Sequence, residues 1–239
     1  MAQDMDKFWY PEQLWQAQSA TLLISRYQQM CYQSDLFRQY DITLPQQVQR
    51  SVLARQAEYL AGRLAVRYLQ QHRGGAVFQL LSATDRSPLW PVGQMGSLAH
   101  SGDCVFAALL ATPLHQVAAQ RIIGLDVESA IVPQHGQISK VNWLSTTERA
   151  LGVAAGLTET ELQTLAFSAK ESLYKALYPQ CQRLMGFQAA TLTLIAQTQF
   201  ELTLTQDWSA VWRRGTILQG HYFWRQQQLF TLVLPQSSN

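Results

Sequence analysis

The segment from Thr158 to Leu177 constrains the fold more than any other part of the chain, because its pattern predicts one long amphipathic helix. Thr158 and Glu161 match a capping box, which marks a helix start, and Pro179 is expected to end the helix. One apolar stripe runs between these signals. Its members recur at three- and four-residue steps: Leu162, Leu165, Ala166, Ala169, Leu173, Ala176 and Leu177.

A second helical pattern lies in the first half of the chain, and predicted strands follow both helices. This pattern covers Gln46–His72 and ends at Gly74 and Gly75, and a capping box from Ser145 to Glu148 opens a shorter helix. The predicted strands are Ala76–Ser82, Cys104–Ala111, Arg121–Glu128, Ala190–Leu194, Phe200–Thr205, Ala210–Trp212, Gly220–Trp224 and Leu229–Leu234. Since a helix and then strands occur twice, we expect two α+β halves.

Other segments carry weaker signals. We expect Pro11–Tyr32 to be partly helical, and the turn residues of Thr84–Pro91, Gly96–Gly102 and Val132–Ser139 predict loops. Cys104–Ala111 is apolar throughout, so this strand should be buried on both faces. A hairpin turn is expected at Gln226–Gln228.

Composition excludes several classes of protein. Apolar residues make up 47% of the 239 residues, which argues against disorder. The 18 basic and 16 acidic residues nearly balance, so a binder that neutralises nucleic-acid phosphates is not expected. The three cysteines have no zinc-binding spacing, and no apolar run is long enough to span a bilayer. With acids rather than a cationic start near the N-terminus, these features favour a soluble, cytoplasmic protein.

Two carboxylates at the end of a predicted strand form the first candidate site. Asp126 and Glu128 are two residues apart, so they project from the same face of the strand. They could be an ordinary solvated strand end, or they could form half of a site for a hard cation such as Mg²⁺. Gly124, just before them, would permit close approach of another backbone or a ligand.

Glu171 and Lys175 form the second candidate site. They are four residues apart and share one face of the long helix. An ordinary surface pair is one reading, and a metal ligand beside a phosphate-binding ammonium is the other. Ser168 to Glu171 also matches a capping box, but the apolar stripe runs through Ser168, so Glu171 is placed inside the helix.

The remaining candidates have structural alternatives that are more common. His100 is expected at a junction between a loop and a strand, where a histidine usually has a structural role. The cations of the first helix could be a solvated face, which the sequence favours, or a phosphate-binding group. These cations are Arg50, Arg55, Arg63 and Arg67.

Five motifs together resemble one family. They are, in order, Arg55–Arg63, Arg86–Pro91, Gly96–Ser101, Gly124–Glu128 and Phe167–Lys175. The last two look like the paired signature of the 4′-phosphopantetheinyl transferases. The size and spacing resemble the Sfp-type group, and within it the branch of the enterobactin synthetase component D proteins. The resemblance covers roughly residues 50–187, and the first forty residues lie outside it.

This resemblance implies an activity and a set of site residues. The family transfers the phosphopantetheine arm of coenzyme A to a serine of an apo acyl or peptidyl carrier protein, and releases adenosine 3′,5′-bisphosphate. Asp126, Glu128 and Glu171 are implied as Mg²⁺ ligands. The implied ligands of coenzyme A are Arg55 and Arg63 at the 3′-phosphate, Arg86 beside the nucleotide, His100 at a phosphate, and Lys170 and Lys175 at the pyrophosphate.

The implied catalytic groups are Glu171, Lys175 and His100. The base that activates the carrier serine could be Glu171, Glu148 or a metal-bound water, since Glu148 matches a family acid near the metal. Ser172 stands where many members have alanine, and we expect this difference to be neutral. The carrier could serve siderophore, polyketide or fatty-acid biosynthesis.

The family also implies the domain organisation. We expect the family's α+β fold, with two similar halves that are related by a pseudo-two-fold axis and meet at a cleft for the nucleotide. Residues 1–115 would bind the nucleotide of coenzyme A, and residues 116–239 would carry the Mg²⁺ ligands and the central helix. Each half has its own small antiparallel sheet and one long helix. Because one chain carries both halves, we expect a monomer.

Two other functions are consistent with parts of the pattern. A non-catalytic module that binds coenzyme A or a carrier protein would need the cations but not the three carboxylates. A metal-dependent hydrolase that splits the pyrophosphate of coenzyme A would release free phosphopantetheine without a carrier. We rank both below the transferase because all three carboxylates are present.

Overall fold

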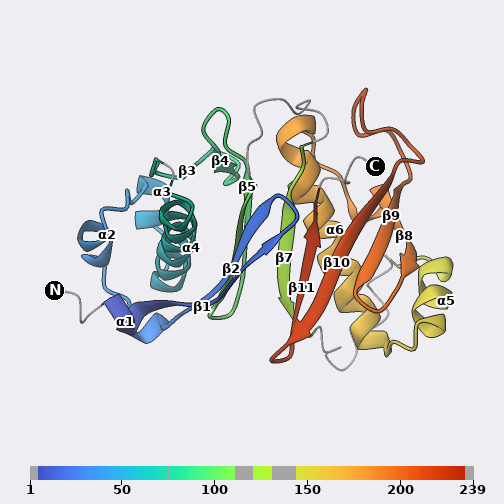
Figure 1. The fold of residues 1–239 in the computed structure, drawn as a ribbon, viewed down its shortest axis with the longest axis horizontal. Coiled ribbons are helices and arrows are strands. Elements are labelled where there is room, and N and C mark those ends of the chain that lie inside the picture. The colour runs from blue at the N-terminus through green and yellow to red at the C-terminus, as the bar shows by residue number, and fades with distance from the viewer. Residues whose placement is uncertain (1–4, 75, 111–120, 131–143, 235–239) are drawn as a thin grey trace. The chain divides into compact units, whose positions relative to one another are not determined.

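The computed structural model describes residues 5–74, 76–110, 121–130 and 144–234. The chain divides into two compact units, Met1–Leu114 and His115–Asn239, which we call the N-terminal and C-terminal units (Figure 1). Each unit contains an antiparallel sheet that packs on one long helix, as Figure 1 shows for α4 and α6. This architecture confirms the predicted α+β class. The expected loop Val132–Ser139 lies outside the described residues.

The N-terminal unit contains a four-stranded sheet in the order β1-β2-β6-β5. It is preceded by the short helix α1 (Met5–Phe8). The strands are β1 (Trp9–Ala17), β2 (Ala20–Tyr27), β5 (Gly96–Ser101) and β6 (Cys104–Leu110). Every residue of β6 is buried, which confirms the expectation for this apolar run over the residues described. β2 is buried along its whole length as well, since it lies between β1 and β6.

Two predictions for this sheet are wrong. The segment Pro11–Tyr32 has no α-helix: most of it forms β1 and β2, joined by a tight turn in which Gln18 has φ 51°, and only Gln29–Cys31 forms a single 3₁₀ turn. Thr21 to Ser25 combines β-branched and apolar residues that fit a buried strand better than a helix. Gly96–Gly102 is not a loop, because its small residues form β5 in register with β6, where His100 lies opposite Val105.

The long helix of the N-terminal unit is α4 (Leu53–His72). The predicted helix over Gln46–His72 is interrupted, because α3 (Gln46–Gln49) ends before α4 begins. One face of α4 packs on β2 and β6 through buried residues that include Leu60, Ala61 and Leu64. The shorter elements are η1 (Gln29–Cys31), α2 (Leu36–Gln39), β3 (Leu81–Ser82) and β4 (Pro88–Leu89). Of the predicted strand Ala76–Ser82, only β3 is extended and paired.

The C-terminal unit contains a five-stranded antiparallel sheet in the order β7-β11-β10-β9-β8. The strands are β7 (Gly124–Ser129), β8 (Ala190–Ile195), β9 (Gln199–Leu204), β10 (Ile217–Arg225) and β11 (Gln228–Val233). The predicted hairpin turn is confirmed, with Gln226 and Gln227 at positive φ. The predicted strand Ala210–Trp212 is wrong, because this segment forms a turn. The backbone N–H of Trp208 donates to the carbonyl of Trp212 and closes this turn.

Both capping boxes of the C-terminal unit are confirmed. Ser145 with Glu148 opens α5 (Thr146–Ala154), and Thr158 with Glu161 opens α6 (Glu159–Cys181). Pro179 does not end α6, which continues to Cys181 and stops at Gln182 in the left-handed region with φ 48°. A proline removes its own N–H donor and its ring crowds the carbonyl four residues earlier, and α6 runs just two residues beyond it.

Small and hydroxyl side chains let α6 lie very close to the sheet. A Cβ atom added to Gly124 would lie 1.9 Å from the carbonyl oxygen of Ser172 on α6, so this glycine is required by close packing. Ser168 and Ser172 are fully buried, and their hydroxyls lie 2.8 and 2.5 Å from that of Thr231 on β11. This contact holds α6 in a fixed register over β7 and β11. No helix within the described ranges is long and apolar enough to cross a bilayer.

Candidate active site

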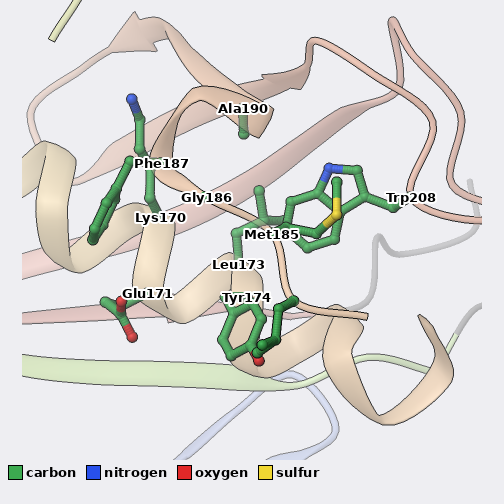
Figure 2. A pocket seen from close by; sticks show the side chains of 10 residues that line it. Lys170, Glu171, Leu173, Tyr174, Met185, Gly186, Phe187, Ala190 and Trp208 are labelled. Carbon is green, nitrogen blue, oxygen red and sulfur yellow. The ribbon is translucent and has the colours of Figure 1, made fainter. Parts of the chain in front are cut away.

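Three carboxylates come together where α6 lies over β7 in the C-terminal unit. Asp126 and Glu128 project from the same face of β7, as expected from their spacing. Glu171 lies on α6, and its side chain points away from that of Lys170 in Figure 2. Each of the three carboxylates interacts electrostatically with at least one of the others. Residues from distant parts of the chain therefore form one acidic group.

The ionisation of this group is perturbed by its surroundings. Burial raises the pKa of Glu128 to about 7, and the negative charges of Asp126 and Glu171 add to the effect while Lys175 opposes it. Burial also raises the pKa of Glu171, with Asp126 adding to the effect and Lys175 again opposing it. Like charges that are partly removed from water disfavour full ionisation unless a cation joins them.

Lys175 offsets part of the negative charge of the three carboxylates. Its Nζ atom lies 2.5 Å from Oδ1 of Asp126. The other oxygen, Oδ2, is buried and has no hydrogen-bond partner among the described residues. Within the same residues, no three side chains of histidine, cysteine, aspartate or glutamate are arranged closely enough to hold a metal ion. The carboxylates are thus neighbours, but they do not form an assembled metal site.

The chemistry of this group nevertheless fits Mg²⁺. All three side chains offer carboxylate oxygens, the ligands that this hard cation prefers. The buried Oδ2 of Asp126 has an unused acceptor, and a buried acceptor without a partner is costly. Asp126, Glu128 and Glu171 are therefore the residues that could hold the ion.

A second lysine of α6, Lys170, belongs to a different and closed ion pair. Its Nζ lies 2.7 Å from Oε1 of Glu148, and the two side chains are only 4% and 1% exposed. Glu148 also accepts hydrogen bonds from the backbone N–H groups of Ser145 and Leu192. Burial alone would raise the pKa of Glu148, but the contact with Lys170 and these backbone donors hold it below its ordinary value. The predicted contact of Lys170 with a pyrophosphate stays a prediction.

An apolar pocket lies beside the acidic group (Figure 2). Its volume is about 200 Å³, and Lys170 and Glu171 are among the residues that line it. Its apolar lining includes Leu173, Tyr174, Leu184, Met185, Phe187 and Trp208. Pockets for drug-sized ligands hold about 300–1,000 Å³, so this one suits a narrow, chain-like group better than a nucleotide. Sequence reasoning missed the pocket, because it depends on how the segment after α6 folds back beside Trp208.

In the N-terminal unit, the structure brings Arg55 and His100 together. Arg55 is near the start of α4 and His100 is on β5, and their Nη1 and Nε2 atoms lie 3.4 Å apart. Glu58, one turn further along α4, forms ion pairs with both, and its Oε1 lies 2.9 Å from Nε2 of His100. Sequence reasoning missed Glu58. Its spacing from Arg55 fits a helical ion pair, but the contact with His100 requires the packing of α4 on the sheet.

The two remaining arginine candidates differ in their surroundings. Arg63 is 8% exposed, donates hydrogen bonds to the carbonyl of Leu80 and the hydroxyl of Ser82, and lies over the ring of Tyr59 at 4.0 Å. These contacts are structural, and its predicted binding of a phosphate stays a prediction. Arg86 lies in a turn at φ 72°. Burial lowers the pKa of Arg55, and the positive charge of Arg86 lowers it further.

Comparison with known proteins gives consistent matches over both units. Residues 44–110 match the model of the 4′-phosphopantetheinyl transferase N-terminal domain, and residues 122–229 match that of the 4′-phosphopantetheinyl transferase superfamily. Enterobactin synthase component D of Salmonella typhimurium is 32% identical over 206 residues, which cover 84% of this chain and 82% of the relative. The 4′-phosphopantetheinyl transferase Npt of Nocardia iowensis is 31% identical over 152 residues, or 61% of this chain and 62% of the relative.

Proposed function

Since the chain belongs to the 4′-phosphopantetheinyl transferase superfamily and is an enzyme of that class, we propose that it transfers the phosphopantetheine arm of coenzyme A to a serine of an apo carrier protein, in a reaction that requires Mg²⁺ and releases adenosine 3′,5′-bisphosphate. The observation that carries this proposal is the acidic group of Asp126, Glu128 and Glu171 beside Lys175. Relatives named for enterobactin synthesis make a siderophore-type peptidyl carrier the first substrate to try.

In this proposal, the three carboxylates hold Mg²⁺. The ion supplies Lewis-acid stabilisation of the charge that develops on the pyrophosphate oxygens. Lys175, whose ammonium already contacts Asp126, adds a positive point charge for the same phosphates. Glu171 is our candidate to accept the proton of the carrier serine, and such general-base help contributes about 10²- to 10⁴-fold to the rate.

The other parts of coenzyme A are assigned to groups of matching chemistry. The apolar pocket beside Glu171 would take the narrow pantetheine arm, since its lining is largely apolar and aromatic. Arg55, Arg86 and His100 would bind phosphates, because guanidinium and imidazolium groups are the usual partners of phosphate oxygens. Arg63 and Lys170 are retained as proposed phosphate ligands from the family resemblance alone. The cytoplasmic location and the monomeric state remain predictions.

The direct test is mass spectrometry of an apo carrier protein after incubation with coenzyme A, Mg²⁺ and the enzyme. The carrier should gain the mass of phosphopantetheine, with one adenosine 3′,5′-bisphosphate released for each carrier modified, and a chelator should prevent both. If siderophore, polyketide and fatty-acid carriers all stay unmodified, the transferase proposal fails. Release of free phosphopantetheine without a carrier would instead indicate the hydrolase.

Calorimetry separates the transferase from the non-catalytic binding module. For the transferase, coenzyme A should bind more tightly with Mg²⁺ than without it, because the carboxylates repel a pyrophosphate until a cation joins them. Equal binding under both conditions, together with no transfer, would favour the binding module.

A further inference from the structure

A single oxygen atom of Glu58 contacts the ends of Arg55 and His100 in the N-terminal unit, and the second contact is an ion pair when His100 is protonated. Its Oε1 lies 2.9 Å from Nε2 of His100 and forms an ion pair with Nη1 of Arg55. These are the same two nitrogens that lie 3.4 Å from each other. Glu58 therefore occupies the position between the two cations where an oxygen of a bound anion would lie.

The arrangement differs from an ordinary surface pair along a helix. His100 comes from β5, so the group joins two elements and not only one turn of α4. The Glu58 side chain is 24% exposed, yet its Oε1 atom is buried and neither of its contacts has the geometry of a hydrogen bond. An oxygen that two cations attract without aligned hydrogen bonds is held mainly by charge. A phosphate, with more negative charge and several acceptor oxygens, can replace it.

We propose that Glu58 is an internal competitor for the phosphate-binding pair Arg55 and His100. In the free enzyme its carboxylate offsets the positive charge of this pair and holds the two side chains together. A phosphate of coenzyme A displaces it on binding, and the carboxylate returns as the nucleotide product leaves. Glu58 is thus a positioning residue that weakens nucleotide binding and favours product release. The inference rests on the proposed function, which assigns Arg55 and His100 to phosphates.

The decisive variant is Glu58→Gln, which keeps the shape of the side chain and removes its charge. Calorimetry with adenosine 3′,5′-bisphosphate should give a Kd about fivefold lower than that of the wild type, because a nearby negative charge is gone but solvent screens part of its effect. The KM for coenzyme A should fall as well. A purely structural role for Glu58 predicts weaker binding, so an unchanged or higher Kd would overturn the proposal.

Two further variants make the result specific. Glu12→Gln removes another carboxylate that pairs with an arginine of the same unit, Arg26, and should leave the Kd unchanged. Arg55→Gln should raise the Kd, and Glu58→Gln should have a smaller effect in that background. If Arg55→Gln leaves the Kd unchanged, the phosphate assignment in the proposed function fails. If Arg55→Gln weakens binding and Glu58→Gln does not strengthen it, only the competitor proposal fails.

Discussion

Helix α6 carries two lysines that each pair with an acid, and the two pairs differ in how completely they are satisfied. Lys170 and Glu148 have side chains that are 4% and 1% exposed, and further backbone donors complete the carboxylate. Lys175 and Asp126 are 29% and 5% exposed, and one oxygen of Asp126 has no partner among the residues described. The Lys170–Glu148 pair is buried and its carboxylate is fully partnered, whereas the Lys175–Asp126 pair is partly exposed and keeps an acceptor that a ligand could use.

This difference separates structural from functional charge on one helix. Charges that are buried and paired with one another are costly to disrupt. A half-buried lysine beside a partly unsatisfied carboxylate is less costly to remove and can exchange partners. We therefore expect Lys170 to act mainly on the stability of the fold and Lys175 mainly on the reaction.

The largest expected effect on stability is that of Lys170→Met. This change leaves the Glu148 carboxylate buried without its cation, which should lower the free energy of unfolding by about 3–5 kcal/mol. Urea unfolding followed by circular dichroism measures the loss. The matched variant Lys175→Met should cost less than Lys170→Met, because the Lys175 side chain is 29% exposed and water can take the place of its ammonium group. Equal losses for the two variants would contradict the distinction between the pairs.

The reverse pattern is expected for activity. Lys175→Gln should slow transfer by about 10²-fold, a loss typical of removing a positioned charge that stabilises the transition state. The rate of carrier modification measures it, with unfolding curves to show that the fold persists. Arg149→Gln is the control, since Arg149 on α5 pairs with Glu159 at the start of α6 and both side chains are exposed. Comparable rates for Lys175→Gln and the control would show that Lys175 has no role in the reaction.

The sequence predicted those parts of this picture that depend on local signals. Thr158 with Glu161 fixed the start of α6, and the two-residue spacing of Asp126 and Glu128 put them on one face of β7. The N-terminal hairpin and β5 were mispredicted, because the pairing of β1, β2 and β5 with distant strands outweighs their weak local preferences.

Partners that arise only by packing could not be predicted from spacing. Glu148 and Lys170 are in separate helices, and Glu148 was assigned to the neighbourhood of a metal from the family resemblance. In the structure its carboxylate completes the capping box of α5, the ion pair with Lys170 and a hydrogen bond from β8, and its placement near a metal stays a prediction. The contact of Glu58 with His100 likewise needs α4 and β5 in place.

The buried ion pair of Lys170 and Glu148 also predicts how the stability of the protein depends on pH. The pKa of Glu148 is lower in the folded protein than the value of about 4.3 expected in the unfolded chain. Its contribution is therefore complete above about pH 4.3 and is lost as the pH falls through the folded pKa. Glu148→Gln mimics the protonated acid, so the difference in unfolding free energy between the wild type and this variant should stay constant above about pH 4.3 and shrink as the pH falls below it. A constant difference would show that the carboxylate is not held ionised.

The smallest effect is expected at the contact that holds α6 over the sheet. Ser172→Ala removes a hydroxyl that lies 2.5 Å from that of Thr231, but Thr231 keeps its contacts with the hydroxyl and the carbonyl of Ser168. No buried polar side chain then loses all its partners, so the cost should be about 1 kcal/mol or less, with transfer nearly unchanged. Thr231→Val is the sharper comparison, because it leaves both serine hydroxyls without this partner. A loss for Ser172→Ala as large as that for Thr231→Val would mean that Ser172 alone sets the position of α6, and with it the distance between Lys175 and Asp126.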